Sequence, residues 1–386
     1  MYQIKLLNNI AEKGLAQLDS HFTLTENSQP ADAILVRSAD MLDYTFEPSL
    51  LGIARAGAGT NNIPIARCSE AGIAVFNTPR ANANAVKELA VCALLLSSRR
   101  IAEGIQWVST LDPNSDVPAL VEKGKKDFAG CELMGKKLGV IGLGAVGGMV
   151  ANIALSLGME VFGSDPFMSV DAAWSLSRHV KHAPNYEFLY RNCDYISIHV
   201  PLNDSTRGML CADAFERMKP GMRIINLARG GLANNDDLKA AIASGQVARY
   251  VTDFPEADLL GVPNIVTIPH LGASTDESEE NCAIMASRQI ADYLSEGIIR
   301  NSVNLPDFTE SRGDLFRITL INRNVPNIIG QITAALASEG INIEHLFNRA
   351  KKEYAYTVID TSTTPSSHCL QTLRDIDGII RVRVIS

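Results

Sequence analysis

The chain has 386 residues, of which 46% are hydrophobic, and this is enough for two or three domains that each bury a core. Its formal net charge is −8, and acidic and basic residues are mixed along the chain, so no basic stripe is present to bind nucleic acid. The stretch Met1–Leu7 has no signal-peptide pattern, no apolar run reaches the roughly 18 residues of a membrane span, and the seven cysteines form no C-x-x-C pair. We therefore expect a cytoplasmic protein with no membrane partner, no disulfide framework and no metal site.

Short apolar runs that end in a small or polar residue alternate with helical patterns through most of the chain. Examples are residues 32–37, 72–77, 137–142, 159–165, 193–199 and 222–227. This alternation predicts an α/β fold with two Rossmann-like, doubly wound parallel sheets. Two long helical patterns, at 84–106 and 276–297, are expected to connect the domains. We predict a discontinuous substrate-binding domain (1–98 and 273–303) with a cofactor domain (99–272) inserted into it.

Three arginines follow expected strands in the amino-terminal region: Arg37, Arg55 and Arg80. Backbone N–H groups near Ala56 and Gly57 could cradle an anion beside them. This arrangement favours a substrate that carries a phosphate group.

A G-x-G-x-x-G pattern, with glycines at 142, 144 and 147, directly follows an expected strand and opens a helix. Such glycines allow a tight turn and close approach of the backbone to a pyrophosphate, which the helix amino terminus attracts. The next expected strand ends at Asp165, where a carboxylate can bind ribose hydroxyls and would repel a 2′-phosphate. The pattern therefore predicts NAD rather than NADP.

The later strands of the same domain end in polar residues, at His199, Arg229, Asp253 with Glu256, and His270. Ligands of doubly wound sheets gather at the carboxyl ends of the strands. Oxidation of an alcohol needs a base for the hydroxyl proton, a carboxylate beside that base and a cation for a substrate carboxylate. These requirements assign His270 as acid/base, Glu256 as its partner and Arg229 as the carboxylate clamp, whereas His199 is expected to be structural.

The carboxyl-terminal part is expected to be a separate regulatory module. Residues 304–314 form a polar stretch that we interpret as a linker. Residues 315–386 follow a βαββαβ pattern, which is too small for catalysis to be the first expectation.

Several of these motifs resemble the D-isomer-specific 2-hydroxyacid dehydrogenase family, and in particular the branch that oxidises 3-phospho-D-glycerate to 3-phosphohydroxypyruvate in the first step of L-serine synthesis. The motifs are RAGAGTNN (55–62), FNTP (76–79), GLGAVG (142–147), HVPL (199–202), NLARGG (226–231) and PHLGAST (269–275). The resemblance implies cofactor contacts at Ala145, Val146, Val200, Pro201, Leu227, Ala228, Asp253, Gly272 and Ala273. It implies that Asn77 and Thr78 orient the substrate or the nicotinamide, and that the chain is a homodimer or homotetramer.

The chain departs from the family pattern around the acidic partner of His270. The family carries D-V-F-x-x-E-P, whereas this chain has a shortened D-F-P-E-A-D from Asp253 to Asp258. Counting along the motif selects Asp258, and matching Phe-Pro selects Glu256. We favour Glu256.

The carboxyl-terminal unit resembles an ACT domain, whose relatives in this enzyme class can bind serine between two copies. Their pattern is H-x-N-x-P-G, and here Asn322 replaces the histidine and Asn327 the glycine, while Asn324, Pro326 and Asn342 match. The resemblance implies a serine site at Asn322, Asn324 and Asn342, or an ACT unit that serves dimerisation alone.

Two other functions fit the same fold. One is a reductase for glyoxylate, hydroxypyruvate or D-lactate, which would not need the three arginines. The other is an NAD-sensing corepressor that binds protein partners, because the fold also serves such proteins.

Overall fold

The computed structural model describes residues 1–25 and 29–385, which form two compact units. One unit joins Met1–Asn82 to the segment that begins at Asp276, and the other is Ala83–Thr275. The α/β class, with two parallel sheets and a carboxyl-terminal antiparallel sheet, is confirmed.

The amino-terminal part of the first unit is a five-stranded parallel sheet with strand order β2-β1-β3-β4-β5. Its elements are β1 (Tyr2–Leu6), α1 (Glu12–Leu15), β2 (Phe22–Thr25), β3 (Ala33–Val36), β4 (Gly52–Arg55), α2 (Ile65–Glu70), β5 (Ala74–Phe76) and α11 (Asp276–Glu296). Helix α11 packs on the sheet through Ala286, Ile290 and Tyr293. A Cβ on Gly14 would come within 2.5 Å of Ala283, so a glycine is needed where α1 crosses α11.

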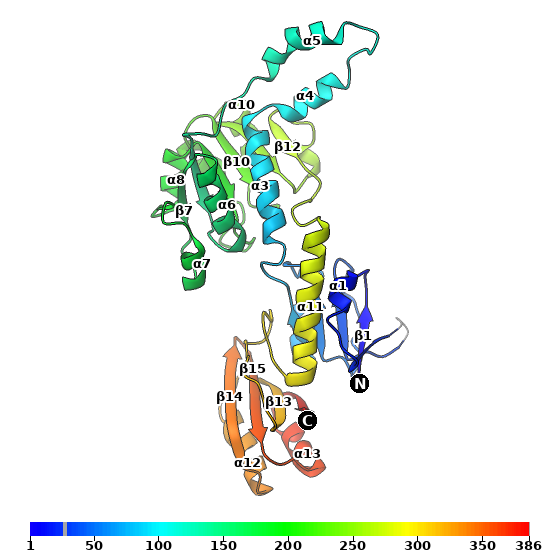
Figure 1. The fold of residues 1–386 in the computed structure, drawn as a ribbon. Coiled ribbons are helices and arrows are strands. Elements are labelled where there is room, and N and C mark those ends of the chain that lie inside the picture. The colour runs from blue at the N-terminus through cyan, green and yellow to red at the C-terminus, as the bar shows by residue number, and fades with distance from the viewer. Residues whose placement is uncertain (26–28, 386) are drawn as a thin grey trace. The chain divides into compact units, whose positions relative to one another are not determined.

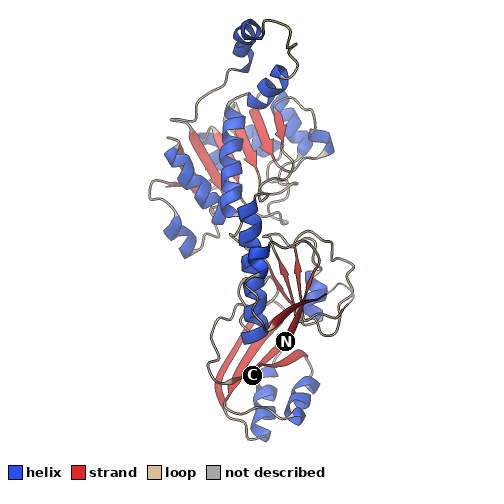
Figure 2. Ribbon diagram, turned by 45° about the vertical axis from the view of Figure 1, so that its right-hand side comes forward, coloured by secondary structure: helices blue, strands red, loops and turns tan. Residues whose placement is uncertain are grey.

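The carboxyl-terminal module is the expected βαββαβ unit, with the antiparallel order β14-β15-β13-β16. It consists of β13 (Phe316–Arg323), α12 (Ile328–Ser338), β14 (Ile343–Lys351), β15 (Tyr354–Thr361), α13 (Ser367–Asp375) and β16 (Ile379–Ile385). Figure 2 shows the two helices on one face of this sheet, where Ile332, Leu336 and Leu373 close a small core. The other face carries Ile321, Tyr356 and Val358 into the same core as α11.

The second unit is built on a seven-stranded parallel sheet with the order β12-β11-β10-β9-β6-β7-β8. Its elements are α3 (Ala83–Ser98), α4 (Ile101–Val108), α5 (Val117–Gly124), η1 (Lys125–Phe128), β6 (Lys137–Ile141), α6 (Ala145–Ser156), β7 (Glu160–Ser164), α7 (Val170–Ser175), β8 (Lys181–His182), α8 (Tyr186–Asn192), β9 (Tyr195–Ile198), α9 (Ala212–Arg217), β10 (Met222–Asn226), α10 (Asn235–Ala243), β11 (Val247–Thr252), η2 (Ala257–Leu259) and β12 (Ile265–Thr267). Helices α3 and α6 lie side by side against this sheet (Figure 1). The order reverses at β6, which places the glycine turn at the switch point of the sheet.

The observed division differs from the predicted domain boundaries. The expected break at 98/99 falls inside the second unit, because α3 packs on α6, β10 and β11 rather than on the amino-terminal sheet. The stretch 304–314 is not a free linker, since Leu305 and Phe308 are buried in the core beneath α11. The carboxyl-terminal module is therefore a docked part of the first unit.

The single long helix expected over 84–106 is also wrong, because α3 ends at Ser98 and α4 begins at Ile101. Among the described residues, no helix combines the length and the apolar character that a membrane crossing would need.

Candidate active site

The glycine turn after β6 has the geometry of a dinucleotide cradle. Gly142 has a φ of +86°, and a Cβ there would lie 2.7 Å from the His199 carbonyl oxygen. A Cβ on Gly147 would lie 1.9 Å from the Gly142 oxygen, so only glycine lets α6 pack this close to the turn. Beside Gly144, by contrast, a Cβ would meet nothing within 4 Å, which leaves open space in front of the helix amino terminus. The three positions fit the three glycine roles of a pyrophosphate site.

Asp165 lies at the end of β7 and ties the glycine turn to that strand. Its two carboxylate oxygens accept hydrogen bonds from the backbone N–H groups of Leu143, at 2.8 Å, and Phe167, at 2.9 Å. The carboxylate is thereby fixed directly after β7, with lone pairs left over for hydroxyl donors.

The loop that carries Arg229 is shaped by Asn226, the buried first residue of the NLARGG motif, to which the motif alone assigns no separate role. The Asn226 amide donates to the Arg229 carbonyl and to the Tyr250 hydroxyl, both at 2.9 Å, and its oxygen accepts from the Ala228 N–H. Leu227 is buried and Arg229 is exposed, so the backbone is held in place while the guanidinium remains at the surface.

Asp253 and His270 follow β11 and the neighbouring strand β12. The Asp253 side chain is 1% exposed, and its Oδ2 accepts the Gly272 N–H at 3.1 Å. Burial raises the pKa of Asp253, against the Gly272 hydrogen bond and the positive fields of His270 and Arg229. Its Oδ1 has no hydrogen-bond partner among the described residues, which suits an acceptor for a cofactor amide.

The exposed His270 ring is held by an aromatic contact that the sequence analysis did not anticipate. The Phe254 ring lies 4.7 Å from it, centroid to centroid, at an angle of 47°. Phe254 belongs to the Phe-Pro motif that favoured Glu256 as the acidic partner. This motif is the feature of the sequence that could have indicated the contact with His270.

Glu256 and Asp258 lie on the same loop but have different surroundings. Asn235 donates to both carboxylates, at 2.9 Å and 3.0 Å. Asp258 is also paired with Lys239 at 3.1 Å, and that hydrogen bond lowers the pKa of Asp258. Glu256 lies beside Gly230, next to Arg229, with its Oε1 3.3 Å from a Cβ placed on that glycine. In the part of the chain that the structure describes, neither carboxylate forms a hydrogen bond with His270.

His199 packs beneath the glycine turn and has a structural environment. Its Nε2 lies 2.8 Å from the Ser197 hydroxyl, and its backbone N–H binds the Ile141 carbonyl. Burial lowers the pKa of His199 to about 4, so the ring is neutral at pH 7.

The arginines of the first unit differ in how far they are already engaged. Arg55 donates to the carbonyl oxygens of Arg37, at 2.9 Å, and Gly59, at 2.7 Å, and so braces the loop at 56–59. Arg37 forms an ion pair with Glu279 of α11. Arg80, with a φ of +71°, is exposed and forms no ion pair with any described residue.

Asn77 and Thr78, to which the family resemblance gives a role, are held by hydrogen bonds to the loop at 56–59. Asn77 donates to the Ala58 carbonyl at 2.6 Å, and Thr78 is buried with its N–H bound to the Gly57 carbonyl. The Ala56–Gly57 backbone thus belongs to one braced loop with Arg55.

The three asparagines of the carboxyl-terminal module are not equivalent. Asn322 is buried in β13, where its amide oxygen accepts from Thr357 and its nitrogen donates to the Arg323 carbonyl. Asn324 and Asn342 are exposed, and their amides donate to the Lys352 carbonyl and to Glu344. Asn327, where the family has glycine, has a φ of +63°, a left-handed conformation that asparagine tolerates.

Comparison with known proteins identifies the family. Residues 91–272 match the model described as "D-isomer specific 2-hydroxyacid dehydrogenase, NAD binding domain", which confirms the NAD expectation. The D-3-phosphoglycerate dehydrogenase of Haemophilus influenzae is 30% identical over 361 residues, covering 90% of this chain and 84% of that protein. The enzyme of the same name from Methanocaldococcus jannaschii is 31% identical over 344 residues, covering 85% of this chain. The chain spans only 62% of the length of that M. jannaschii protein.

Solved structures agree with this relationship. The NAD⁺-bound 3-phosphoglycerate dehydrogenase of Entamoeba histolytica matches with a TM-score of 0.61 and 26% identity, over 78% of this chain and 98% of that one. The D-mandelate dehydrogenase of Rhodotorula graminis shares the fold, with a TM-score of 0.67 and 22% identity over 80% of this chain and 99% of that one. The chain therefore belongs to the D-isomer-specific 2-hydroxyacid dehydrogenase family.

Proposed function

We propose that the chain oxidises 3-phospho-D-glycerate to 3-phosphohydroxypyruvate with NAD, in the first step of L-serine synthesis. The observation that carries the proposal is the set formed by Arg229, Asp253 and His270, which follow neighbouring parallel strands of the sheet that holds the glycine turn. The names of the relatives from H. influenzae and M. jannaschii support the choice of substrate.

Each residue has a separate task in this reaction. His270 accepts the hydroxyl proton of the substrate, and Arg229 binds the substrate carboxylate and draws charge from the forming carbonyl oxygen. Bound NAD supplies the hydride acceptor. Asp253 offers its free carboxylate oxygen to the cofactor amide, and Glu256 is the carboxylate that orients the His270 ring.

The substrate phosphate is assigned to the loop at 56–59, together with Arg55, which braces that loop, and Arg80. Arg55 supplies charge while it braces the loop, and Arg80 has no ionic partner among the described residues. Arg37 is already neutralised by Glu279. Because that pairing leaves fewer arginines for a phosphate, it is the observation that favours a second candidate, a reductase for an unphosphorylated 2-oxoacid.

We infer that the chain is a homodimer or homotetramer. Figure 1 shows α4 and α5 leaving the body of the second unit as a hairpin. Ile105 and Val108 on α4 are 67% and 50% exposed, and the neighbouring Trp107 contacts Phe128, with ring centroids 5.3 Å apart and the planes tilted by 36°. Exposed apolar side chains grouped in this way are typical of an interface.

The carboxyl-terminal module is, in this proposal, an ACT-type regulatory domain that takes serine at Asn324 and Asn342, with Asn322 as an internal support. Millimolar serine should then raise the melting temperature of the protein, and no change would refute the serine site. We place the protein in the cytoplasm, where its seven free cysteines suit a reducing environment.

The reaction is tested by following NADH consumption with 3-phosphohydroxypyruvate. His270→Asn should lower kcat by about a hundredfold to ten-thousandfold, the usual contribution of a general acid or base, and should still bind NADH. An active His270→Asn protein would refute the assignment of the base.

A further inference from the structure

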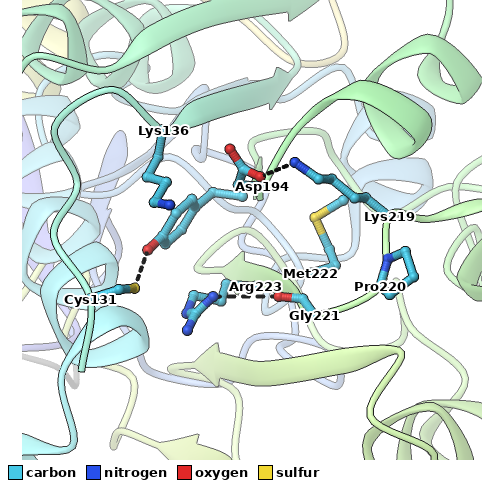
Figure 3. A pocket seen from close by; sticks show the side chains of 9 residues that line it. Cys131, Lys136, Asp194, Lys219, Pro220, Gly221, Met222 and Arg223 are labelled. Atoms are coloured by element: carbon cyan, nitrogen blue, oxygen red, sulfur yellow. Dashed lines mark hydrogen bonds and ion pairs between the residues drawn. The ribbon is translucent and has the colours of Figure 1, made fainter. Parts of the chain in front are cut away.

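A further cavity lies at the amino-terminal ends of the strands of the seven-stranded sheet, opposite to the ends that carry the candidate active site. This cavity, of about 240 Å³, lies where β9 and β10 begin, whereas Arg229 and His270 follow the carboxyl ends of strands. Figure 3 shows the side chains that line the cavity. It is lined by Cys131, Lys136, Asp194, Tyr195, Lys219, Pro220, Gly221, Met222 and Arg223. The five residues of β10, at about 3.3 Å each, separate the amino-terminal end of this strand from its carboxyl end. The cavity is therefore no part of the cofactor cradle.

The cavity carries an excess of positive charge. Its lining includes three cationic side chains and one carboxylate, that of Asp194. The two Asp194 oxygens are both in use, because one pairs with Lys219 and the other accepts the Lys137 N–H at 2.9 Å. Within residues 1–25 and 29–385, neither Lys136 nor Arg223 forms an ion pair. The lining therefore keeps a net positive charge, to which the Lys136 ammonium and the Arg223 guanidinium contribute.

Arg223 is held in a fixed orientation. Its Nε donates to the Ser97 carbonyl at 3.0 Å, and its guanidinium carbon lies 5.6 Å from the centre of the Tyr195 ring. Its other contact is a long hydrogen bond of 3.4 Å to the Gly221 carbonyl. Lys136 and Arg223 lie on opposite sides of the cavity in Figure 3. A guanidinium fixed in this way, opposite a free ammonium, suits the tetrahedral oxygens of a phosphate group.

We propose that this cavity binds a small phosphate-bearing anion, held between the Lys136 ammonium and the Arg223 guanidinium. A dianionic phosphate neutralises both charges. The volume lies below the roughly 300–1,000 Å³ of ordinary ligand pockets, so inorganic phosphate or a short phosphate monoester fits and a nucleotide does not. The bound anion would join β10 to the end of α3, because Arg223 also holds the Ser97 carbonyl.

Cys131 reports on this site in the intact protein. Its half-exposed thiol lines the cavity, with its sulfur 3.3 Å from the Tyr195 hydroxyl, whereas Cys92 is exposed on α3 and does not line it. The rate of iodoacetamide alkylation of each cysteine is measured by peptide mass spectrometry, with and without inorganic phosphate at constant ionic strength. Protection grows as 1 + [L]/Kd, so phosphate at about ten times its Kd should slow alkylation of Cys131 about tenfold and leave Cys92 unchanged.

Two lysine variants show where the phosphate binds. Lys136→Gln should abolish the protection, and Lys352→Gln, which removes another exposed lysine, should keep it. A parallel titration with glycerol 2-phosphate distinguishes a monoester from free phosphate by which protects at lower concentration. Equal alkylation rates with and without either anion would overturn the proposal, and so would equal protection of Cys92 or protection that survives in Lys136→Gln. Phosphate bound at the proposed substrate loop would not depend on Lys136, so the two proposals fail separately.

Discussion

His270 and Phe254 form the contact on which the proposed chemistry depends most. An imidazole that takes part in proton transfer must keep one orientation, and here the aromatic contact at 4.7 Å restrains the ring before any carboxylate reaches it. In the proposed mechanism, the orientation of His270 therefore depends on the whole loop from Asp253 to Glu256, since Phe254 and Glu256 lie two residues apart.

The choice between Glu256 and Asp258 is open to a direct test by substitution. Glu256→Gln should lower kcat by about tenfold or more, equivalent to roughly 1.4 kcal/mol, because the carboxylate proposed to orient His270 loses its charge. Asp258→Asn should leave kcat within about twofold, since Asp258 is neutralised by Lys239. Steady-state kinetics at saturating NAD measure both. The reverse order of effects would assign the role to Asp258.

His199 should make the stability of the protein depend on pH. Its pKa lies at about 4 in the folded state against an ordinary value of 6.5, so the unfolded chain binds the extra proton. The contribution is complete above pH 6.5 and is lost as the pH falls toward 4. Between these values, the free energy of unfolding of the wild type should fall up to about 1.4 kcal/mol per pH unit faster than that of His199→Gln. The free energies of unfolding are measured by denaturant titration at several pH values. An equal dependence on pH in the wild type and in His199→Gln would contradict this prediction.

At the residue scale, the geometry of the glycine turn and of Asp165 could be predicted from the sequence, whereas the partners of the substrate-binding candidates could not. Gly142, Gly147 and Asp165 act through local backbone geometry, which a short motif specifies. The roles of Arg37 and Asp258 depend on Glu279 and Lys239, which are distant in sequence. Only the folded chain brings such partners together.

At the scale of elements, the docking of the carboxyl-terminal module depends on the end of α11. Arg317, fully buried in β13, forms a two-point ion pair with Asp360 of β15, at 2.7 and 2.8 Å. It also donates to the Glu296 carbonyl, while Arg383 donates to the carbonyls of Tyr293 and Leu294. These arginines bind the last turn of α11, whose carbonyl groups lack helical partners.

Removal of Arg317 should therefore destabilise the first unit strongly. Arg317→Met leaves the Asp360 carboxylate buried without a partner, which typically costs about 3–5 kcal/mol. Denaturant unfolding should show this loss, and adding Asp360→Asn should recover part of it. Arg217→Met, which breaks an exposed helical pair with Asp213, serves as the control and should leave the unfolding midpoint unchanged. An equally small effect of Arg317→Met would contradict the account.

The predicted helix over 84–106 shows that apolar periodicity does not locate the end of a helix. The apolar pattern continues through Arg100, yet α3 stops at Ser98. The Ser97 carbonyl binds Arg223, and the Ser98 carbonyl accepts the Cys131 N–H. Both partners come from later segments, so no local pattern could locate the end. The strands, by contrast, could be predicted from the sequence because buried parallel strands are continuous apolar runs.

At the scale of the whole molecule, the α4–α5 hairpin is the surface that self-association should use. Ile105→Glu places a charge in the proposed interface and should raise the dimer dissociation constant by at least about tenfold. Val170→Glu, at another exposed apolar position in the same unit, should not. Sedimentation velocity across a concentration series measures both. Unchanged assembly in Ile105→Glu would exclude the hairpin.

The most direct test of the proposed function is a comparison of substrates. NADH consumption is followed with 3-phosphohydroxypyruvate, hydroxypyruvate, glyoxylate, pyruvate and 2-oxoglutarate under the same conditions. The account predicts that kcat/KM for the phosphorylated substrate exceeds the others by about a hundredfold or more, equivalent to roughly 2.7 kcal/mol. Equal or better use of an unphosphorylated acid would leave His270 as the base but would contradict the phosphate site at Arg55 and Arg80.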